Sequence, residues 1–223
     1  MYRYELLNGH YVVTIDGKKF LIDTGMWFSF PFNPSLKEVF IDGVRHDLSS
    51  KPTQVDTEDT FELVGTELDG FIGMSILSKT SLTIYKNGYI DFKPTDVQGE
   101  KINMLCPSPI IVPGVCDGHH GPFIIDTGAK YGYGVHRLFY GKMPFDLMVE
   151  DYNPDEELKH FRSDIYHFVL SLGGITKNVD ICYNNVVERK HLQKAHSIIV
   201  VSPNPFFEEV CVFDFRRGLL ILK

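Results

Sequence analysis

The triplet Asp-Thr-Gly occurs twice in this chain and supplies the residues best suited to chemistry. Asp23-Thr24-Gly25 follows the apolar run Phe20-Leu21-Ile22, and Asp126-Thr127-Gly128 follows Phe123-Ile124-Ile125, an offset of 126 − 23 = 103 positions. Two carboxylates that meet at hydrogen-bonding distance cannot both ionise cheaply, so one pKa rises and the pair shares a proton. Such a pair can take a proton from a bound water and give one to a carbonyl oxygen, so the pattern indicates water activation.

A second repeated segment predicts that the chain consists of two related halves. Leu82–Ile90 has a counterpart in Val212–Leu220, at an offset of 218 − 88 = 130, and the order of the repeated segments is the same in both halves. We therefore expect an N-terminal lobe over residues 1–100 and a C-terminal lobe over residues 101–223. A linker is expected near Lys93–Pro113, where regular structure would be interrupted by Pro94, Pro107, Pro109 and Pro113.

This constellation resembles the aspartic peptidases, the retropepsin-like and pepsin-like family. The resemblance implies a mainly β, two-lobed acid-protease-like β-barrel fold with pseudo-twofold symmetry. It implies that Asp23 and Asp126 are the catalytic pair of an endopeptidase that hydrolyses peptide bonds in an extended polypeptide. It also implies no metal or organic cofactor, and a monomer with an internal pseudo-dimer, since both halves lie in one chain.

The remaining triplet residues match supporting positions of that family. Gly25 and Gly128 match glycines that let the backbone turn sharply and approach the carboxylates closely. Thr24 and Thr127 match hydroxyls that connect the two loops across the pseudo-twofold axis. We expect this network to hold the carboxylates coplanar, provided that every member is hydrogen-bonded.

The residue after each triplet bears on the working pH. Pepsin-like enzymes usually carry Ser or Thr there, whose hydroxyl donates to the aspartate, whereas this chain has Met26 and Ala129. An ionised aspartate would be stabilised less, so we expect a less acidic working pH than that of a pepsin.

The family also carries an apolar-apolar-Gly motif late in each lobe, and the two halves differ in it. Phe71-Ile72-Gly73 fits well. The second copy should fall in Ile198–Pro203, where Ser202 or Pro203 stands in place of glycine. This departure, together with Met26, leaves an alternative open: a catalytically inactive peptide-binding or scaffolding protein on the same fold.

Substrate contacts are expected from Trp27, Gly73 and Tyr131. At least two of four aromatic residues are expected in the core: Trp27, Phe28, Phe30 and Phe32. For Tyr131, Tyr133 and Tyr140, a position in the substrate groove and a position in the core remain equally open. The hairpin at Asp42-Gly43 is short and lacks the tyrosine of pepsin-like flaps. We expect a longer hairpin around Gly173-Gly174, or the segment Tyr131–Tyr140, to cover more of the bound substrate.

The expected elements are mostly strands joined by tight turns. Hairpins are predicted at four dipeptides, Asp16-Gly17, Asp42-Gly43, Asn87-Gly88 and Gly173-Gly174. Helical pattern is sparse: Val187–His196 is the best short candidate, and Val135–Gly141 predicts a single turn.

Composition narrows the function classes. The 29 acidic and 22 basic side chains give a net charge of −7, which argues against a nucleic-acid-binding face. Neither a membrane-spanning run nor a signal-peptide layout is visible. Four scattered cysteines predict free thiols and a cytoplasmic location. The cluster Cys116–His120 contains metal-ligating residue types, but a surface loop is the favoured interpretation. For the acidic run Glu150–Asp151 and Asp155–Glu157, a solvated loop is favoured.

Overall fold

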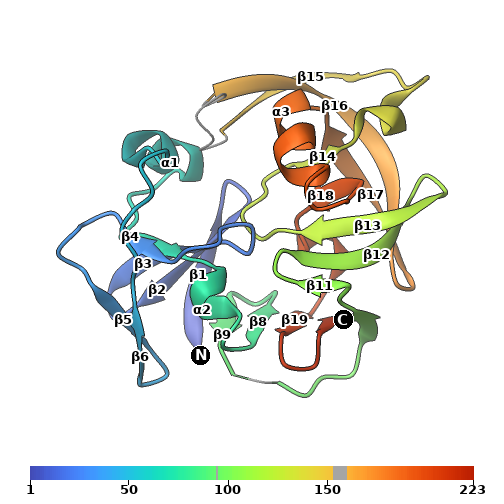
Figure 1. The fold of residues 1–223 in the computed structure, drawn as a ribbon. Helices are drawn as coiled ribbons and strands as arrows, with labels where there is room; N and C mark the ends of the chain where they lie inside the picture. The colour runs from blue at the N-terminus through green and yellow to red at the C-terminus, as the bar shows by residue number, and fades with distance from the viewer. Residues whose placement is uncertain (94, 153–159) are drawn as a thin grey trace.

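The computed structural model describes residues 1–93, 95–152 and 160–223 of the chain. This part is mainly β, as expected, and its strands form sheets of ten, eight and two strands (Figure 1). Runs rich in Val, Ile, Phe and Tyr form the strands because branched and aromatic side chains pack well on a pleated surface.

The ten-stranded sheet contains strands from both ends of the chain. Its strands, in sheet order, are β10 (Glu100–Asn103), β20 (Leu219–Leu222), β19 (Val210–Asp214), β8 (Leu82–Tyr85), β9 (Tyr89–Asp91), β1 (Tyr2–Leu7), β2 (His10–Ile15), β3 (Lys18–Ile22), β7 (Gly70–Ile72) and β4 (Phe30–Pro31). The repeated segments form the hairpins β8–β9 and β19–β20. These lie side by side, with Cys211 opposite Ile84, so the two copies of the repeat pair with each other.

The eight-stranded sheet contains the second triplet. Its order is β11 (Cys106–Pro107), β12 (Ile110–Cys116), β13 (His119–Ile125), β18 (Ile199–Val201), β14 (Gly132–Gly134), β17 (Ile175–Cys182), β16 (His160–Leu172) and β15 (Phe145–Tyr152). β12 also pairs with β16. A separate two-stranded sheet consists of β5 (Glu38–Ile41) and β6 (Val44–Asp47).

The strand arrangement around each triplet is the same. β3 runs parallel to β7 and β13 runs parallel to β18, and β4 and β14 pair antiparallel with those partners. The N–H of Asp23 donates to the carbonyl of Ile72 over 3.1 Å, and the N–H of Asp126 donates to that of Val201 over 3.0 Å. Each aspartate therefore leaves its strand at the same point of a three-strand pattern. Ile22 and Ile125, the residues before the aspartates, are fully buried in one shared core.

The segment 93–113 contains regular strands, so the expectation that its prolines interrupt regular structure was wrong. β10, β11 and the start of β12 lie within 93–113, and the expected lobe boundary at 100/101 falls inside β10. Prolines are tolerated in strands where their missing N–H is not required. Pro107 lies on β11 at the sheet edge, and Pro113 stands opposite Pro122. Pro94 lies outside the described residues.

All four predicted hairpins are confirmed. Asp16, Asp42 and their following glycines have positive φ, as a two-residue turn between strands requires, and Gly88 and Gly173 also have positive φ. Asp117-Gly118 forms a fifth such turn between β12 and β13, so the Cys116–His120 cluster is a hairpin end. The side chains of the acidic run Glu150–Asp151 and Asp155–Glu157 lie outside the described part.

The helical elements are short. They are α1 (Thr57–Val64), α2 (Met74–Leu77), α3 (Asn185–Val187) with the π-helical turn η2 (Glu188–Leu192), and the 3-10 turns η1 (His136–Phe139) and η3 (Asn204–Phe206). The predicted helix Val187–His196 is present but begins earlier in the chain. The side chain of Asn184 caps it by accepting the N–H groups of Val186 and Val187. The single turn within Val135–Gly141 is confirmed as η1.

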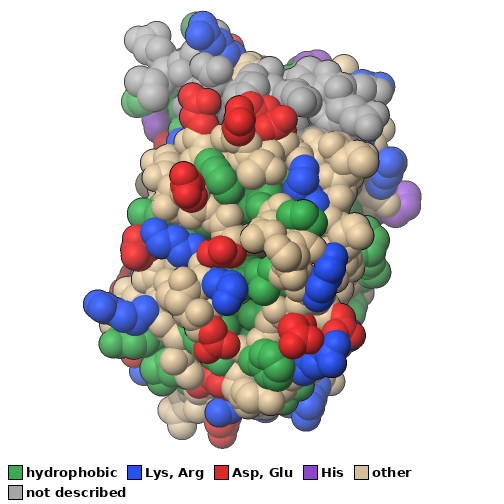
Figure 2. Space-filling view, turned by 90° about the vertical axis from the view of Figure 1, so that its left-hand side faces the viewer, with side chains coloured by type: hydrophobic (Ala, Val, Ile, Leu, Met, Phe, Trp, Pro, Cys, Tyr) green, Lys and Arg blue, Asp and Glu red, His purple; other side chains and the backbone are tan. Residues whose placement is uncertain are grey.

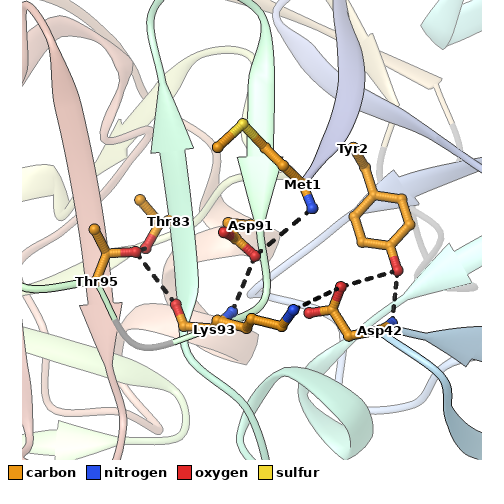
Figure 3. Close-up of polar contacts among 7 residues, drawn as sticks. All are labelled: Met1, Tyr2, Asp42, Thr83, Asp91, Lys93 and Thr95. Carbon is orange, nitrogen blue, oxygen red and sulfur yellow. Dashed lines mark hydrogen bonds and ion pairs between the residues drawn. The ribbon is translucent and has the colours of Figure 1, made fainter.

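The turn between β5 and β6 is anchored to the ten-stranded sheet. The N–H of Asp42 donates to the hydroxyl of Tyr2 over 2.6 Å, and Lys93 Nζ lies 3.7 Å from Asp42 Oδ1 (Figure 3). Lys93 in turn donates its N–H to Asp91, 3.3 Å away. These contacts hold the hairpin tip against β1 and β9.

Three further observations concern the whole described part. All four cysteines are free thiols, as expected. Within the described residues, we find no helix with the length and hydropathy needed to cross a membrane. On the face shown in Figure 2, acidic and basic side chains are interspersed with apolar ones.

Candidate active site

The two triplet loops are connected by an exchange of threonine hydrogen bonds. Thr24 Oγ1 donates to the carbonyl of Ile125 over 3.1 Å and accepts from the N–H of Thr127 over 2.9 Å. Thr127 Oγ1 makes the reciprocal pair, donating to Ile22 over 2.8 Å and accepting from Thr24 N–H over 3.0 Å. Both side chains are buried, so each hydroxyl satisfies backbone groups of the opposite loop that have no access to water.

The carboxylates of Asp23 and Asp126 face each other above this network. The two carboxyl groups interact electrostatically and both accept the N–H of Gly25. Asp23 Oδ1 accepts the N–H groups of Gly25 and Met26, each over 2.8 Å. Asp126 Oδ1 accepts the N–H of Gly128 over 2.8 Å and that of Gly25 over 3.0 Å. The amide of Gly25 is therefore shared by both carboxylates.

Both triplet glycines are required by close approach. A Cβ added to Gly25 would lie 2.7 Å from Asp126 Cγ, and one added to Gly128 would lie 2.5 Å from Asp23 Cγ. Each glycine thus packs against the aspartate of the other loop, and any larger residue would push the carboxylates apart.

Burial is the main cause of a raised pKa for both carboxyl groups. For Asp23, the charge of Asp126 raises the pKa further and the N–H groups of Met26 and Gly25 oppose the rise, leaving it well above its ordinary value. For Asp126, the N–H of Gly128, the interaction with Asp23 and the charge of His191 oppose the rise. The two groups titrate as a unit.

The dyad opens into a cleft of about 790 Å³. Its first wall comes from the loop after Asp23, the segment before α1, and α1 itself. Its second wall comes from the loop after Asp126, β18 and the η2 region. The side chains of Asp23 and Asp126 remain partly accessible to solvent at the cleft floor. This volume lies within the range typical of ligand pockets.

Trp27 is the one expected substrate contact that the structure places in the cleft. It lines the first wall and is 58% exposed. Tyr131 is not among the described residues that line the cleft; Tyr133 lines it instead. Phe30 is buried and stacks on Phe71, as expected of core residues.

Gly73 also does not line the cleft, contrary to its expected role. It is buried behind the loop that follows Asp23, where its N–H donates to Ser29 Oγ over 2.9 Å. A Cβ here would lie 2.5 Å from the carbonyl oxygens of Met26 and Phe28. Gly73 therefore supports the loop from behind.

The register identifies the counterpart of Gly73 in the second half. Ile22 pairs with Ile72 and Ile125 pairs with Val201, so the next residue, Ser202, occupies the place of glycine. Ser202 is buried, and Asn204 N–H lies 3.4 Å from its hydroxyl. A side chain fits here because the loop after Asp126 takes a different path from the loop after Asp23.

The expected covering turn at Gly173-Gly174 lies elsewhere, and that part of the expectation was wrong. The N–H of Gly174 donates to Glu100 Oε1 over 3.1 Å, at the outer end of β16. Phe161, near the opposite end of β16, lines the cleft. Because a thirteen-residue strand is roughly 40 Å long, only one end of it can reach the site. β15, paired with this end, contacts α1 and runs along the top of Figure 1.

Sequence reasoning missed two features of the cleft. His10 at the start of β2 lines it and is 2% exposed. Burial lowers the pKa of His10 to about 4, with Lys130 adding to the effect and the backbone of Gly128 opposing it. Lysines of the second wall were also missed, because no local motif marks them.

Within the described residues, no group of three or more His, Cys, Asp or Glu side chains is arranged to hold a metal ion. No protein-family model matches the chain, and no curated protein matches it.

Proposed function

We propose that this chain is an aspartic endopeptidase of the retropepsin-like and pepsin-like family. The observation that carries the proposal is the pair Asp23 and Asp126, which both accept the N–H of Gly25 and lie together at the floor of a cleft. An extended peptide in that cleft would present a backbone carbonyl to the pair.

The arrangement supports hydrolysis without a covalent enzyme intermediate. The ionised member of the pair accepts a proton from a water molecule, and the water oxygen bonds to the substrate carbonyl carbon. The protonated member gives its proton to the carbonyl oxygen, which forms a tetrahedral diol. The carboxyl group that took the water proton then gives it to the amide nitrogen, a diol hydroxyl returns its proton to the other carboxylate, the C–N bond breaks, and a carboxylic acid and an amine leave. The amides of Gly25, Met26 and Gly128 stabilise whichever carboxylate is ionised.

The proposal includes a two-lobed, pseudo-twofold fold with lobes over residues 1–100 and 101–223. The repeated pattern of β3, β7 and β4 against β13, β18 and β14 supports it. The reciprocal bonds of Thr24 and Thr127 support it as well, since they relate one loop to the other by exchange. Both aspartates come from one chain, so a monomer holds a complete dyad. A cytoplasmic location, drawn from the free cysteines, belongs to the same proposal.

The test is cleavage of a mixed peptide library, with products identified by mass spectrometry. Wild type and Asp164→Asn, a change at an exposed aspartate outside the cleft, should cleave the same peptides. Asp23→Asn and Asp126→Asn should lose the activity by at least about 10³-fold. Equal residual cleavage in wild type and Asp126→Asn would remove the dyad from the account.

The alternative is a peptide-binding protein that does not cleave. Ser202 in place of a glycine is the observation that favours it. Saturable peptide binding by folded wild type, with no product at any pH from 3 to 8, would select this alternative.

A further inference from the structure

The two walls of the cleft differ in charge. The first wall carries no charged side chain among the described residues that line it; its members are Met26, Trp27, Gln54, Val55, Leu63 and Met74. The second wall carries Lys130, Lys190 and Lys194, with His191 beside them. Among the described lining residues, only Asp23 and Asp126 are carboxylates. The cleft is therefore cationic outside the dyad, although the chain as a whole carries a net charge of −7.

Lys130 is held near the floor of the cleft by packing. It follows the second triplet closely, and its Cγ would lie 3.2 Å from a Cβ built on Gly9. Its Nζ lies 5.0 Å from the ring centre of Tyr131. The charge of Lys130 contributes to the lowered pKa of His10, which lines the same cleft. Its position is thus set by neighbours on both halves of the chain.

Lys190 and Lys194 come from the helical segment above the second triplet. The N–H of Gln193 donates to Glu188 over 2.8 Å and that of Ala195 to His191 over 3.1 Å, so helical bonding continues past η2. Residues four apart on such a turn share a face, which explains why both lysines line the cleft. The charge of His191 lowers the pKa of Asp126, so the field of this segment reaches the dyad.

On the face shown in Figure 2, basic side chains do not gather into a patch: they lie among acidic and apolar ones, and acidic side chains group near the top. Charged walls in a partly enclosed groove attract ligands of the opposite charge more strongly than the same charges on an open surface.

From these observations we infer that the substrates are acidic peptides: an Asp or Glu side chain of the bound segment lies against Lys130 and Lys194, while an apolar side chain packs on Trp27. This inference rests on the proposed function for its catalytic readout, but its binding readout is independent. The carboxylate would form ion pairs in a partly desolvated site, and the apolar side chain would bury the exposed indole.

The binding test uses Trp27, the chain's single tryptophan, as a fluorescent reporter inside the cleft. Matched peptides that differ only by Glu or Gln at positions around an apolar centre are titrated at pH 6.5 into wild type and Asp126→Asn. We expect the Glu peptide to bind about two- to tenfold more tightly at low salt, and the difference to shrink in 0.5 M salt. Lys194→Glu should abolish or reverse the preference. Lys101→Glu, the same charge change at an exposed lysine outside the cleft, should leave it intact.

The kcat/KM ratio for the same peptide pairs gives the second readout. Equal binding of Glu and Gln peptides, or a preference that survives Lys194→Glu together with Lys130→Gln, overturns the inference. Cleavage of both peptides at equal rates overturns it while leaving the peptidase proposal in place. A Glu preference in binding without any cleavage supports the inference and contradicts the peptidase proposal.

Discussion

Gly25 donates its backbone N–H to the carboxylate of Asp126 over 3.0 Å, although the two residues lie 101 positions apart. The same N–H also bonds Asp23. One amide therefore sets the spacing of the two acidic groups, and the absence of a side chain at Gly25 is what lets it approach.

Gly25→Ala should reduce kcat/KM by at least about 10²-fold, because the new methyl group would displace Asp126 and a misplacement of about 1 Å is enough for such a loss. The measurement is steady-state cleavage of a peptide found in the library. Gly174→Ala is the matched control, since its Cβ would meet Glu100 at 3.6 Å, an ordinary contact. Full activity of Gly25→Ala would show that the approach is not required.

Thr127→Val should lower the melting temperature by roughly 3–10 °C, because it leaves the buried N–H of Thr24 and the carbonyl of Ile22 without partners. Thr127→Ser retains the hydroxyl and should lose much less. A double-mutant cycle with Thr24→Val measures the coupling. Strictly additive effects would contradict a mutually dependent network.

The pH profile of kcat/KM should be bell-shaped with its optimum above the ordinary pKa of aspartate. Activity requires one proton on the pair. Burial raises the pKa of both carboxyl groups, and the charge of Asp126 raises the pKa of Asp23 further. Both limbs therefore move upward in pH. Cleavage that is fastest at pH 2 would contradict this assignment.

Asp126→Asn should stabilise the folded chain at pH 7 while removing activity. A carboxyl whose pKa is raised on folding contributes stability below the unfolded pKa, and loses it as pH rises toward the folded pKa. At pH 7 the wild type therefore carries a destabilising contribution that asparagine lacks. We expect a gain of about a few degrees in melting temperature at pH 7, and a smaller one at pH 3. A lower melting temperature at pH 7 would argue against a strained pair.

His10→Phe should flatten the pH dependence of stability between about pH 4 and 6.5. The folded pKa of His10 is about 4 because of burial and Lys130, whereas an unfolded histidine titrates near 6.5. The unfolded chain thus binds more protons in this window, and stability falls as pH falls. Urea unfolding at pH 5 and pH 7 gives the comparison, with exposed His196→Phe as control.

Local signals account for the parts of the fold that sequence reasoning predicted. Asp-Gly and Gly-Gly pairs fix turn geometry by themselves, so the hairpins at Asp16, Asp42 and Gly173 could be placed correctly. α1 was missed although Asp56 caps it and Gly65 ends it in a left-handed conformation. Those two signals were present, but the periodicity between them is weak in so short a helix.

The parts that could not be predicted depend on the path of the chain in three dimensions. Whether Ser202 or Pro203 is the counterpart of Gly73 can be decided only from the register of β13 against β18. Gly73 lies behind a loop, and Gly174 lies beside Glu100. Both positions depend on which end of the neighbouring strand faces the dyad. Lys194 and Asp126 share a cleft only because β18 returns the chain to β13.

The ten-stranded sheet has a consequence for biosynthesis. β19 and β20 lie between β8 and β10, so residues 210–222 complete a sheet whose other strands come from residues 2–103. A ribosome-bound chain that lacks residues 210–222 would have β10 without its partner β20, and β8 paired with β9 alone. Assembly of the complete sheet should therefore be delayed until translation has passed residue 222, and for the proposed peptidase this delay would limit cleavage of the nascent chain.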